Sequence, residues 1–178
     1  MYVDDAFIKS RSFAEHLKHL LLFWSAIRKF GLTLKLRKTL FCRKEIPFLG
    51  FILTREGVKP DHARVQAIKE IPEPRTREEL QKFIGMCTYY RRFYKEYARY
   101  LEPFRELMSS SQKFKWQDKH HIAFNMLRNK LSDHVLLNHY RRDRPFCLQT
   151  DGSKTGISAI LFQYDDDGNE LVIALISR

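Results

Sequence analysis

The sequence predicts an α+β fold, and three observations support this prediction. Apolar side chains recur at helical spacing over residues 13–30, and residues 32–53 then change to short strand-like runs. Helical spacing returns over residues 61–131, and β character appears again from Pro145. Helices and strands that occur in separate blocks, without regular alternation, are typical of α+β proteins.

The composition predicts a folded chain. It has 178 residues, of which 44% are apolar and 13% aromatic, enough for a sizeable core. The longest apolar run near the N-terminus, residues 20–24, is far shorter than a membrane span and follows no signal region, so we expect neither a membrane nor a secreted protein. Cys42, Cys87 and Cys147 form no CxxC pair, which argues against a disulfide framework or a zinc ribbon. We expect reduced thiols in an intracellular setting, the cytoplasm or the nucleus.

The charge predicts a polyanionic partner. Thirty-two Lys and Arg residues against 21 Asp and Glu residues give a net charge of +11, which favours nucleic acid. Ten of the basic residues lie between Lys9 and Lys44.

The first helix has clear boundaries in the sequence. Ser12 and Glu15 form a capping box, and Gly31 ends the apolar pattern. We then expect short strands at 33–36, 40–42 and 48–53 in a small antiparallel sheet, followed by a turn at Glu56-Gly57.

A second set of helices should follow. Pro60-Asp61 opens a helix that carries Val65, Ile68 and Ile71, and Pro72-Glu73-Pro74 marks a domain boundary. Thr76 and Glu79 form another capping box. One apolar face of the helix after it carries Leu80, Phe83, Ile84, Cys87, Tyr90, Tyr94 and Tyr97.

The last part of the chain is expected to contain two short helices and then a hairpin. The helices are predicted at 101–108 and 118–131, the latter buried through Ile122, Met126, Leu127 and Leu131. Strands are predicted at 146–151, 156–164 and 171–176, with Asp167-Gly168-Asn169 as a hairpin turn. We therefore interpret Asp165 to Asp167 as a solvated tip, and we place the seven histidines at the surface and at helix ends.

Adjacent carboxylates near the N-terminus are the first candidate site. Asp4 and Asp5 lie between apolar residues at a predicted turn, where they can aim oxygens at a divalent cation. The alternative is a surface turn, because Asp commonly forms turns.

Motifs in a fixed order along the chain resemble the reverse transcriptases of gypsy-class long-terminal-repeat retrotransposons. The resemblance covers almost the whole chain and includes the Y-x-D-D box, the primer grip, the thumb and the start of a ribonuclease H domain. The corresponding motifs here are Tyr2-Val3-Asp4-Asp5, Phe48-Leu49-Gly50-Phe51, Leu80 to Gly85, Tyr89 to Phe93, Phe114-Lys115-Trp116, and Thr150-Asp151-Gly152-Ser153.

The resemblance implies catalytic roles for three carboxylates. Asp4 and Asp5 would be two of three palm ligands for Mg²⁺ or Mn²⁺, with the third on an upstream strand, and Tyr2 beside them would contact nucleic acid. Asp151 would be the first metal ligand of a ribonuclease H site, with its partners further along the parent chain. The alternative for Asp151 is an Asp that starts a β-turn.

Other residues would contact nucleic acid. The resemblance gives Lys38 a role near the departing pyrophosphate, against the alternative of a solvated strand-edge lysine. Phe48, Leu49 and Gly50 would contact the primer, because Gly50 lets the backbone approach a primer end closely. The alternative is that Gly50 forms a β-bulge. Gly85 would let the thumb enter a minor groove, or else serve tight helix packing.

The tyrosines and arginines after Gly85 have two interpretations as well. Tyr89, Tyr90, Arg91 and Arg92 offer stacking surface beside phosphate-binding groups, although a tyrosine stripe at helical spacing more often belongs to a core. We expect Tyr90 inside and Arg91 or Arg92 outside.

The resemblance implies a piece of an RNA-directed DNA polymerase with ribonuclease H activity. It implies a palm remnant with the primer-grip hairpin at 1–72, a helical thumb and connection at 73–143, and ribonuclease H strands at 144–178. The expected partners are RNA, DNA and RNA–DNA hybrid, with deoxynucleoside triphosphates in the intact parent. The chain alone is expected to be inactive. The alternative is a non-catalytic nucleic-acid-binding remnant or a domesticated interaction module.

Overall fold

The computed structural model describes residues 5–110, 112–131, 133, 135–153 and 156–178. By its internal contacts the chain divides into two units, Met1–Cys42 and Arg43–Arg178. Among the described residues, no helix is long and apolar enough to cross a membrane. The predicted limits between palm, thumb and ribonuclease H parts, at 72/73 and 143/144, stay predictions.

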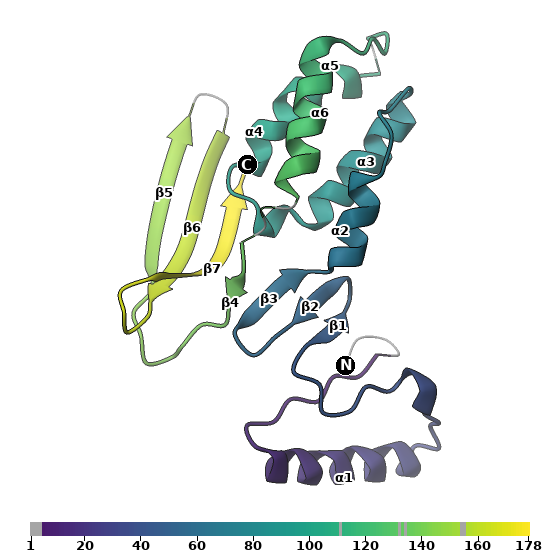
Figure 1. Ribbon diagram of the computed structural model, residues 1–178, viewed down its shortest axis with the longest axis vertical. Coiled ribbons are helices and arrows are strands. Elements are labelled where there is room, and N and C mark those ends of the chain that lie inside the picture. Colours follow the sequence, from purple (N-terminus) through teal and green to yellow (C-terminus); the bar gives the residue numbers. More distant parts are fainter. Residues whose placement is uncertain (1–4, 111, 132, 134, 154–155) are drawn as a thin grey trace. The chain divides into compact units, whose positions relative to one another are not determined.

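The first unit contains the predicted helix, α1 (Phe13–Lys29; Figure 1). The capping box is present, because the Ser12 side chain accepts a hydrogen bond from the Glu15 N–H and the Glu15 carboxylate accepts one from the Arg11 N–H. Gly31, with a φ of 64°, follows the helix as predicted.

The strands predicted at 33–36 and 40–42 are wrong. Residues Leu36–Lys38 form a 3₁₀ helix (η1), and residues 40–42 are irregular. Thr39 donates its hydroxyl to the Lys35 carbonyl at 3.1 Å, a local bond that competes with strand pairing. Apolar side chains alternate here, but among the described residues no strand pairs with this segment.

The second unit begins with an antiparallel sheet in the order β1-β2-β3-β4. Its strands are β1 (Ile46–Phe48), β2 (Phe51–Leu53), β3 (Gly57–Pro60) and β4 (Leu137–Asn138). The prediction of one strand over 48–53 is therefore wrong, since Leu49 and Gly50 turn the chain between two strands. Glu56-Gly57 does mark the following turn.

Helices occupy the sequence between β3 and β4 and lie at the top of the view in Figure 1. Asp61 caps α2 and Thr76 caps α3, as predicted. The prediction of one long helix through Tyr97 is wrong, because α3 ends at Tyr89. The helical elements are α2 (His62–Lys69), α3 (Arg77–Tyr89), η2 (Arg91–Phe93), α4 (Tyr97–Leu101), η3 (Glu102–Phe104), α5 (Arg105–Met108) and α6 (Asp118–Lys130).

The core lies between these helices. Phe83 and Phe124 are fully buried, with ring centroids 4.6 Å apart. The predicted buried face of α6 is partly wrong, because Ile122 and Met126 are 58% and 51% exposed. The helix instead turns Ala123, Phe124 and Leu127 toward the core. It also buries His120 in its first turn, so this histidine has the predicted place at a helix end but does not lie at the surface.

The second sheet has the order β5-β6-β7 and confirms the predicted strands. Its strands are β5 (Cys147–Ser153), β6 (Gly156–Tyr164) and β7 (Glu170–Ser177). Asn138 of β4 donates to the Val172 carbonyl of β7 at 3.2 Å, which links the two sheets.

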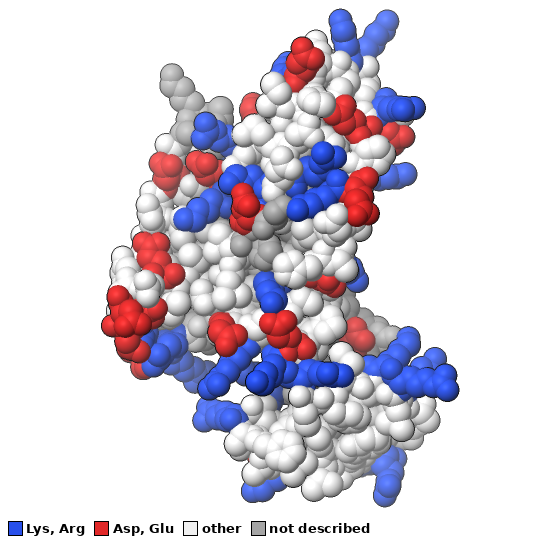
Figure 2. Space-filling model, viewed as in Figure 1, with Lys and Arg blue, Asp and Glu red and all other residues white. Residues whose placement is uncertain are grey.

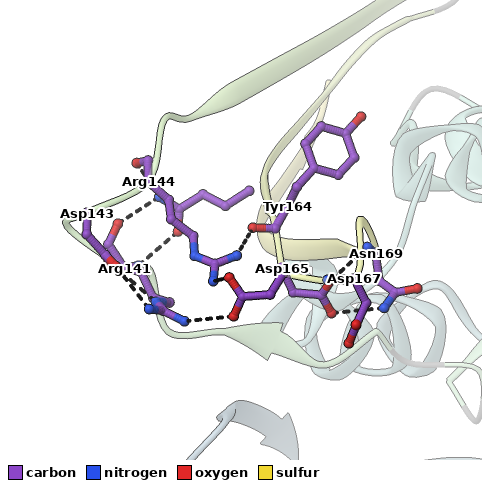
Figure 3. A network of polar contacts seen from close by, with 9 residues as sticks. Arg141, Asp143, Arg144, Tyr164, Asp165, Asp167 and Asn169 are labelled. Atoms are coloured by element: carbon purple, nitrogen blue, oxygen red, sulfur yellow. Dashed lines mark hydrogen bonds and ion pairs between the residues drawn. The ribbon is translucent and has the colours of Figure 1, made fainter.

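The β6–β7 turn is the predicted solvated tip, and it is also tied to a neighbouring loop. Asp165 accepts bonds from the backbone of Asp167 and Asn169. Arg144 extends from the loop before β5 to the Asp166 carboxylate and the Tyr164 carbonyl (Figure 3). Figure 2 shows the carboxylates of this tip as a red patch at the left edge of the view, with basic side chains beside it.

Candidate nucleic-acid interface

The tip of the β1–β2 hairpin is the first part of the site. Phe48 pairs with Phe51, so Leu49 and Gly50 form a two-residue turn. Their φ angles are 48° and 76°, and two positive φ angles are what a type I′ hairpin turn requires. Leu49 adopts a conformation that costs a branched residue about 1–2 kcal/mol.

Two tyrosines at the end of α3 hold this turn. The buried Tyr90 hydroxyl donates to the Gly50 carbonyl at 3.1 Å, and the Tyr89 hydroxyl donates to the Leu49 carbonyl. The Asp61 N–H, at the start of α2, donates to the same Gly50 carbonyl at 3.2 Å. The turn backbone is thus held by α3 and by the chain that leaves β3.

An aromatic cluster packs beneath the turn. The Phe51 ring stacks on Tyr89 with centroids 5.1 Å apart and meets Tyr90 edge-on at 5.8 Å. The Arg92 guanidinium lies over the Phe51 ring, 5.4 Å from its centroid. The packing keeps a cation beside the turn while Arg92 stays exposed.

Close approach explains the glycine in the turn. A Cβ at Gly50 would lie 3.2 Å from Tyr89 Cε1, 3.3 Å from Arg64 Nη1 and 3.4 Å from the Tyr90 hydroxyl. The β-bulge alternative for Gly50 is therefore wrong, because the residue forms the turn itself. The close backbone approach expected here is made by the protein's own tyrosines.

The charges around the turn are positive. Arg91 and Arg92 are exposed and Tyr90 is buried, which confirms the predicted inside and outside positions. Sequence reasoning missed Arg64, since only the tertiary fold brings α2 to the turn. Burial raises the pKa of Tyr90, so its hydroxyl keeps the proton that it donates to Gly50.

Gly85 lies on the exposed face of α3. A Cβ added at Gly85 would meet nothing within 4 Å, so the tight-packing alternative is wrong. The residue leaves an open, shallow position on the same helix that ends at Tyr89. Its role toward a minor groove stays a prediction.

The predicted palm residues lie in the first unit. Tyr2 and Asp4 fall outside the described residues, and Asp5 is exposed. Lys38 is exposed in η1, so the strand-edge alternative is wrong and its role at pyrophosphate stays a prediction. Over the described part of the chain, no three His, Cys, Asp or Glu side chains gather as metal ligands. The described residues therefore supply only part of the ligand set that a two-metal site needs.

Asp151 lies in the second unit, within β5. It pairs with Ser158 of β6, so the β-turn alternative is wrong. The Asp151 side chain lines two adjacent hollows of about 350 and 190 Å³ together with Glu96, which precedes α4. Sequence reasoning did not find this neighbour, which lies 55 positions away in the chain.

Comparison with known proteins agrees with the motifs. Residues 116–178 match the family model described as an RNase H-like domain found in reverse transcriptase. The whole chain is 35% identical to the retrovirus-related Pol polyprotein from transposon opus of Drosophila melanogaster, and 92% of it is 32% identical to the one from transposon gypsy of the same species. The chain belongs to the reverse transcriptase and RNase H-like region of gypsy-class retrotransposon Pol polyproteins. It spans 19% and 17% of the lengths of these two relatives.

Solved structures show the same fold. A foamy viral protease-reverse transcriptase in complex with dsDNA matches 96% of the chain with a TM-score of 0.84 and 24% identity. The same viral protein in complex with RNA/DNA hybrid matches with a TM-score of 0.80. This chain covers 36% and 23% of those two chains, and the likeness confirms the α+β fold of a reverse transcriptase region.

Proposed function

We propose that this chain seats nucleic acid in an RNA-directed DNA polymerase that also has ribonuclease H activity. The observation that carries the proposal is the Leu49-Gly50 turn, which Tyr89 and Tyr90 hold beside exposed arginines. A rigid turn with close-packed backbone and flanking cations suits the sugar-phosphate edge of a primer end. The foamy viral neighbours, bound to dsDNA and to RNA/DNA hybrid, support the same class of partner.

In this proposal the three parts of the chain have the predicted residue ranges. Residues 1–72 belong to a palm, 73–143 to a thumb and connection, and 144–178 to ribonuclease H strands. The parent enzyme would use deoxynucleoside triphosphates in the cytoplasm or nucleus. Bound Mg²⁺ or Mn²⁺ would supply charge stabilisation for phosphoryl transfer, with Asp4 and Asp5 as polymerase ligands and Asp151 as a nuclease ligand.

The chain alone is expected to be inactive. Two-metal transfer needs carboxylates that converge from several elements, and the described residues place no such set together. A primer-extension and hybrid-cleavage assay of the purified chain tests this expectation. Metal-dependent extension that disappears in Asp5→Asn would contradict it.

Binding is the direct test of the proposed function. Fluorescence anisotropy with RNA–DNA hybrid and duplex DNA at several salt concentrations should show affinity that falls steeply with salt, without sequence preference. Arg91→Ala/Arg92→Ala should weaken binding and flatten the salt slope by about 0.9 for each phosphate that the variant no longer neutralises. Lys113→Ala/Lys115→Ala, which removes the same charge from an exposed loop, is the matched control. Absence of binding at low salt would refute the proposal.

A further inference from the structure

Two hollows beside Asp151 lie between the sheet β5–β7 and residues 95–99, the segment in which α4 begins. One hollow is lined by Glu96, Ala98 and Arg99 together with Asp151 and Ser177, and the other by Lys95 and Glu96 together with Asp151. The register of the sheet puts Asp151 opposite Ser158, and Ser158 opposite Ser177. All three therefore point to one face, toward the 95–99 segment.

This segment is held in place. The Ala98 N–H donates to the Ser177 hydroxyl at 3.1 Å, which ties α4 to β7. Glu96 has a φ of 54° and a ψ of 30°, a left-handed conformation that costs a residue with a side chain about 1–2 kcal/mol. The buried Tyr97 ring anchors the chain immediately after Glu96. Lys95 and Arg99 are thus presented at the rim by a fixed backbone.

The rim carries cations beside the carboxylates of Asp151 and Glu96. Asp151 and Glu96 repel a phosphate, so a nucleic-acid strand reaches this place only if nearby cations offset them. Lys95 is exposed and has no ion pair with another described residue, and Arg99 has only an exposed pair with Glu96 at 3.7 Å. An exposed pair of this kind is weak, and Arg99 can exchange it for a phosphate oxygen.

We infer that Lys95 and Arg99 are positioning residues that hold the sugar-phosphate backbone of a nucleic-acid strand over Asp151. The inference rests on the proposed function and extends it from the hairpin turn to a second contact on the ribonuclease H-like sheet. Glu96 acts in the opposite direction, because it competes with phosphate for Arg99 and adds negative charge. Neighbouring residues in one short segment should therefore change binding with opposite signs.

The test measures the affinity of the chain for RNA–DNA hybrid by anisotropy over a salt series. Lys95→Ala/Arg99→Ala should weaken binding by about tenfold for each cation removed and flatten the salt slope. Glu96→Gln, which keeps the side-chain shape, should strengthen binding several-fold. Lys113→Ala/Lys115→Ala controls for net charge, since neither residue lines the hollows.

A second measurement locates the contact. Hybrid should protect Lys95 from acylation, as read by mass spectrometry, and should leave Lys113 reactive. If the native chain binds with a steep salt slope but Lys95→Ala/Arg99→Ala behaves like the control and Lys95 stays reactive, the inference is overturned and the proposed function stands. If the native chain does not bind, both fail.

Discussion

The Tyr90 hydroxyl donates a hydrogen bond to the Gly50 carbonyl across 40 positions of the chain. The bond joins the end of α3 to the tip of the β1–β2 hairpin, so helix and hairpin present one surface. Tyr89 makes the equivalent bond to Leu49. The candidate interface is therefore a product of two segments, and each depends on the other for its position.

The crowding at Gly50 predicts a substitution effect. Gly50→Ala should destabilise the chain more than Gly168→Ala, because both residues have positive φ angles but only Gly50 has close neighbours. The backbone cost that both variants share is about 1 kcal/mol, and displacement of Tyr89 and Arg64 adds to the cost at Gly50. Urea denaturation of both variants measures the difference. Equal losses of stability would mean that the alanine Cβ fits at position 50 without displacing Tyr89 or Arg64.

Gln163 predicts a second stability effect. This side chain is 1% exposed; it accepts a bond from the Arg141 N–H and donates to the carbonyls of Arg141 and Arg144, each at 2.8 Å. Gln163→Leu should cost about 2–4 kcal/mol, because backbone groups lose their partners. Gln149→Leu on exposed β5 is the control. A loss of stability no larger than the control's, in chemical denaturation, would show that water replaces these bonds.

Glu106 predicts a pH dependence of stability. A hydrogen bond from Lys119, and to a smaller extent one from His120, lowers the pKa of Glu106 from its ordinary value of 4.5. The ionised carboxylate therefore stabilises the folded state above pH 4.5, and this contribution is lost as the pH falls through the lower pKa of the folded state.

The measurement compares native chain with Glu106→Gln in urea at several pH values. The gap in free energy of unfolding should be present at neutral pH and close in acid. Glu70→Gln, at the exposed end of α2, controls for loss of a surface charge. A gap that stays constant with pH would exclude the ionic contribution.

Cys87 predicts a difference in thiol reactivity. Burial raises the pKa of its thiol to about 12, whereas Cys42 is exposed. Iodoacetamide at neutral pH should label Cys42 in the native chain and Cys87 only after unfolding. Peptide mapping by mass spectrometry distinguishes the two. Labelling of native Cys87 as fast as Cys42 would show that the core around α3 opens readily.

The sequence by itself determined the features that depend on near neighbours. The capping residues Ser12, Asp61 and Thr76 act on N–H groups two or three positions away, and all three start helices where predicted. The strands β5–β7 were likewise visible as apolar runs with a turn between β6 and β7. Ordered motifs also identified the gypsy-class family.

Tertiary structure decided what depends on distant partners. The run at 48–53 has strand-like composition throughout, and the pairing of β1 with β2 together with the bonds from Tyr89 and Tyr90 makes Leu49 and Gly50 a turn. His120 can be buried because both ring nitrogens have partners: one accepts from the Gln117 N–H and the other reaches Glu106. Asp151 acquires Lys95 and Glu96 as neighbours in the same way. Local patterns encode hydrogen bonds within a few residues, whereas packing between remote segments sets which backbone conformations and charges come together.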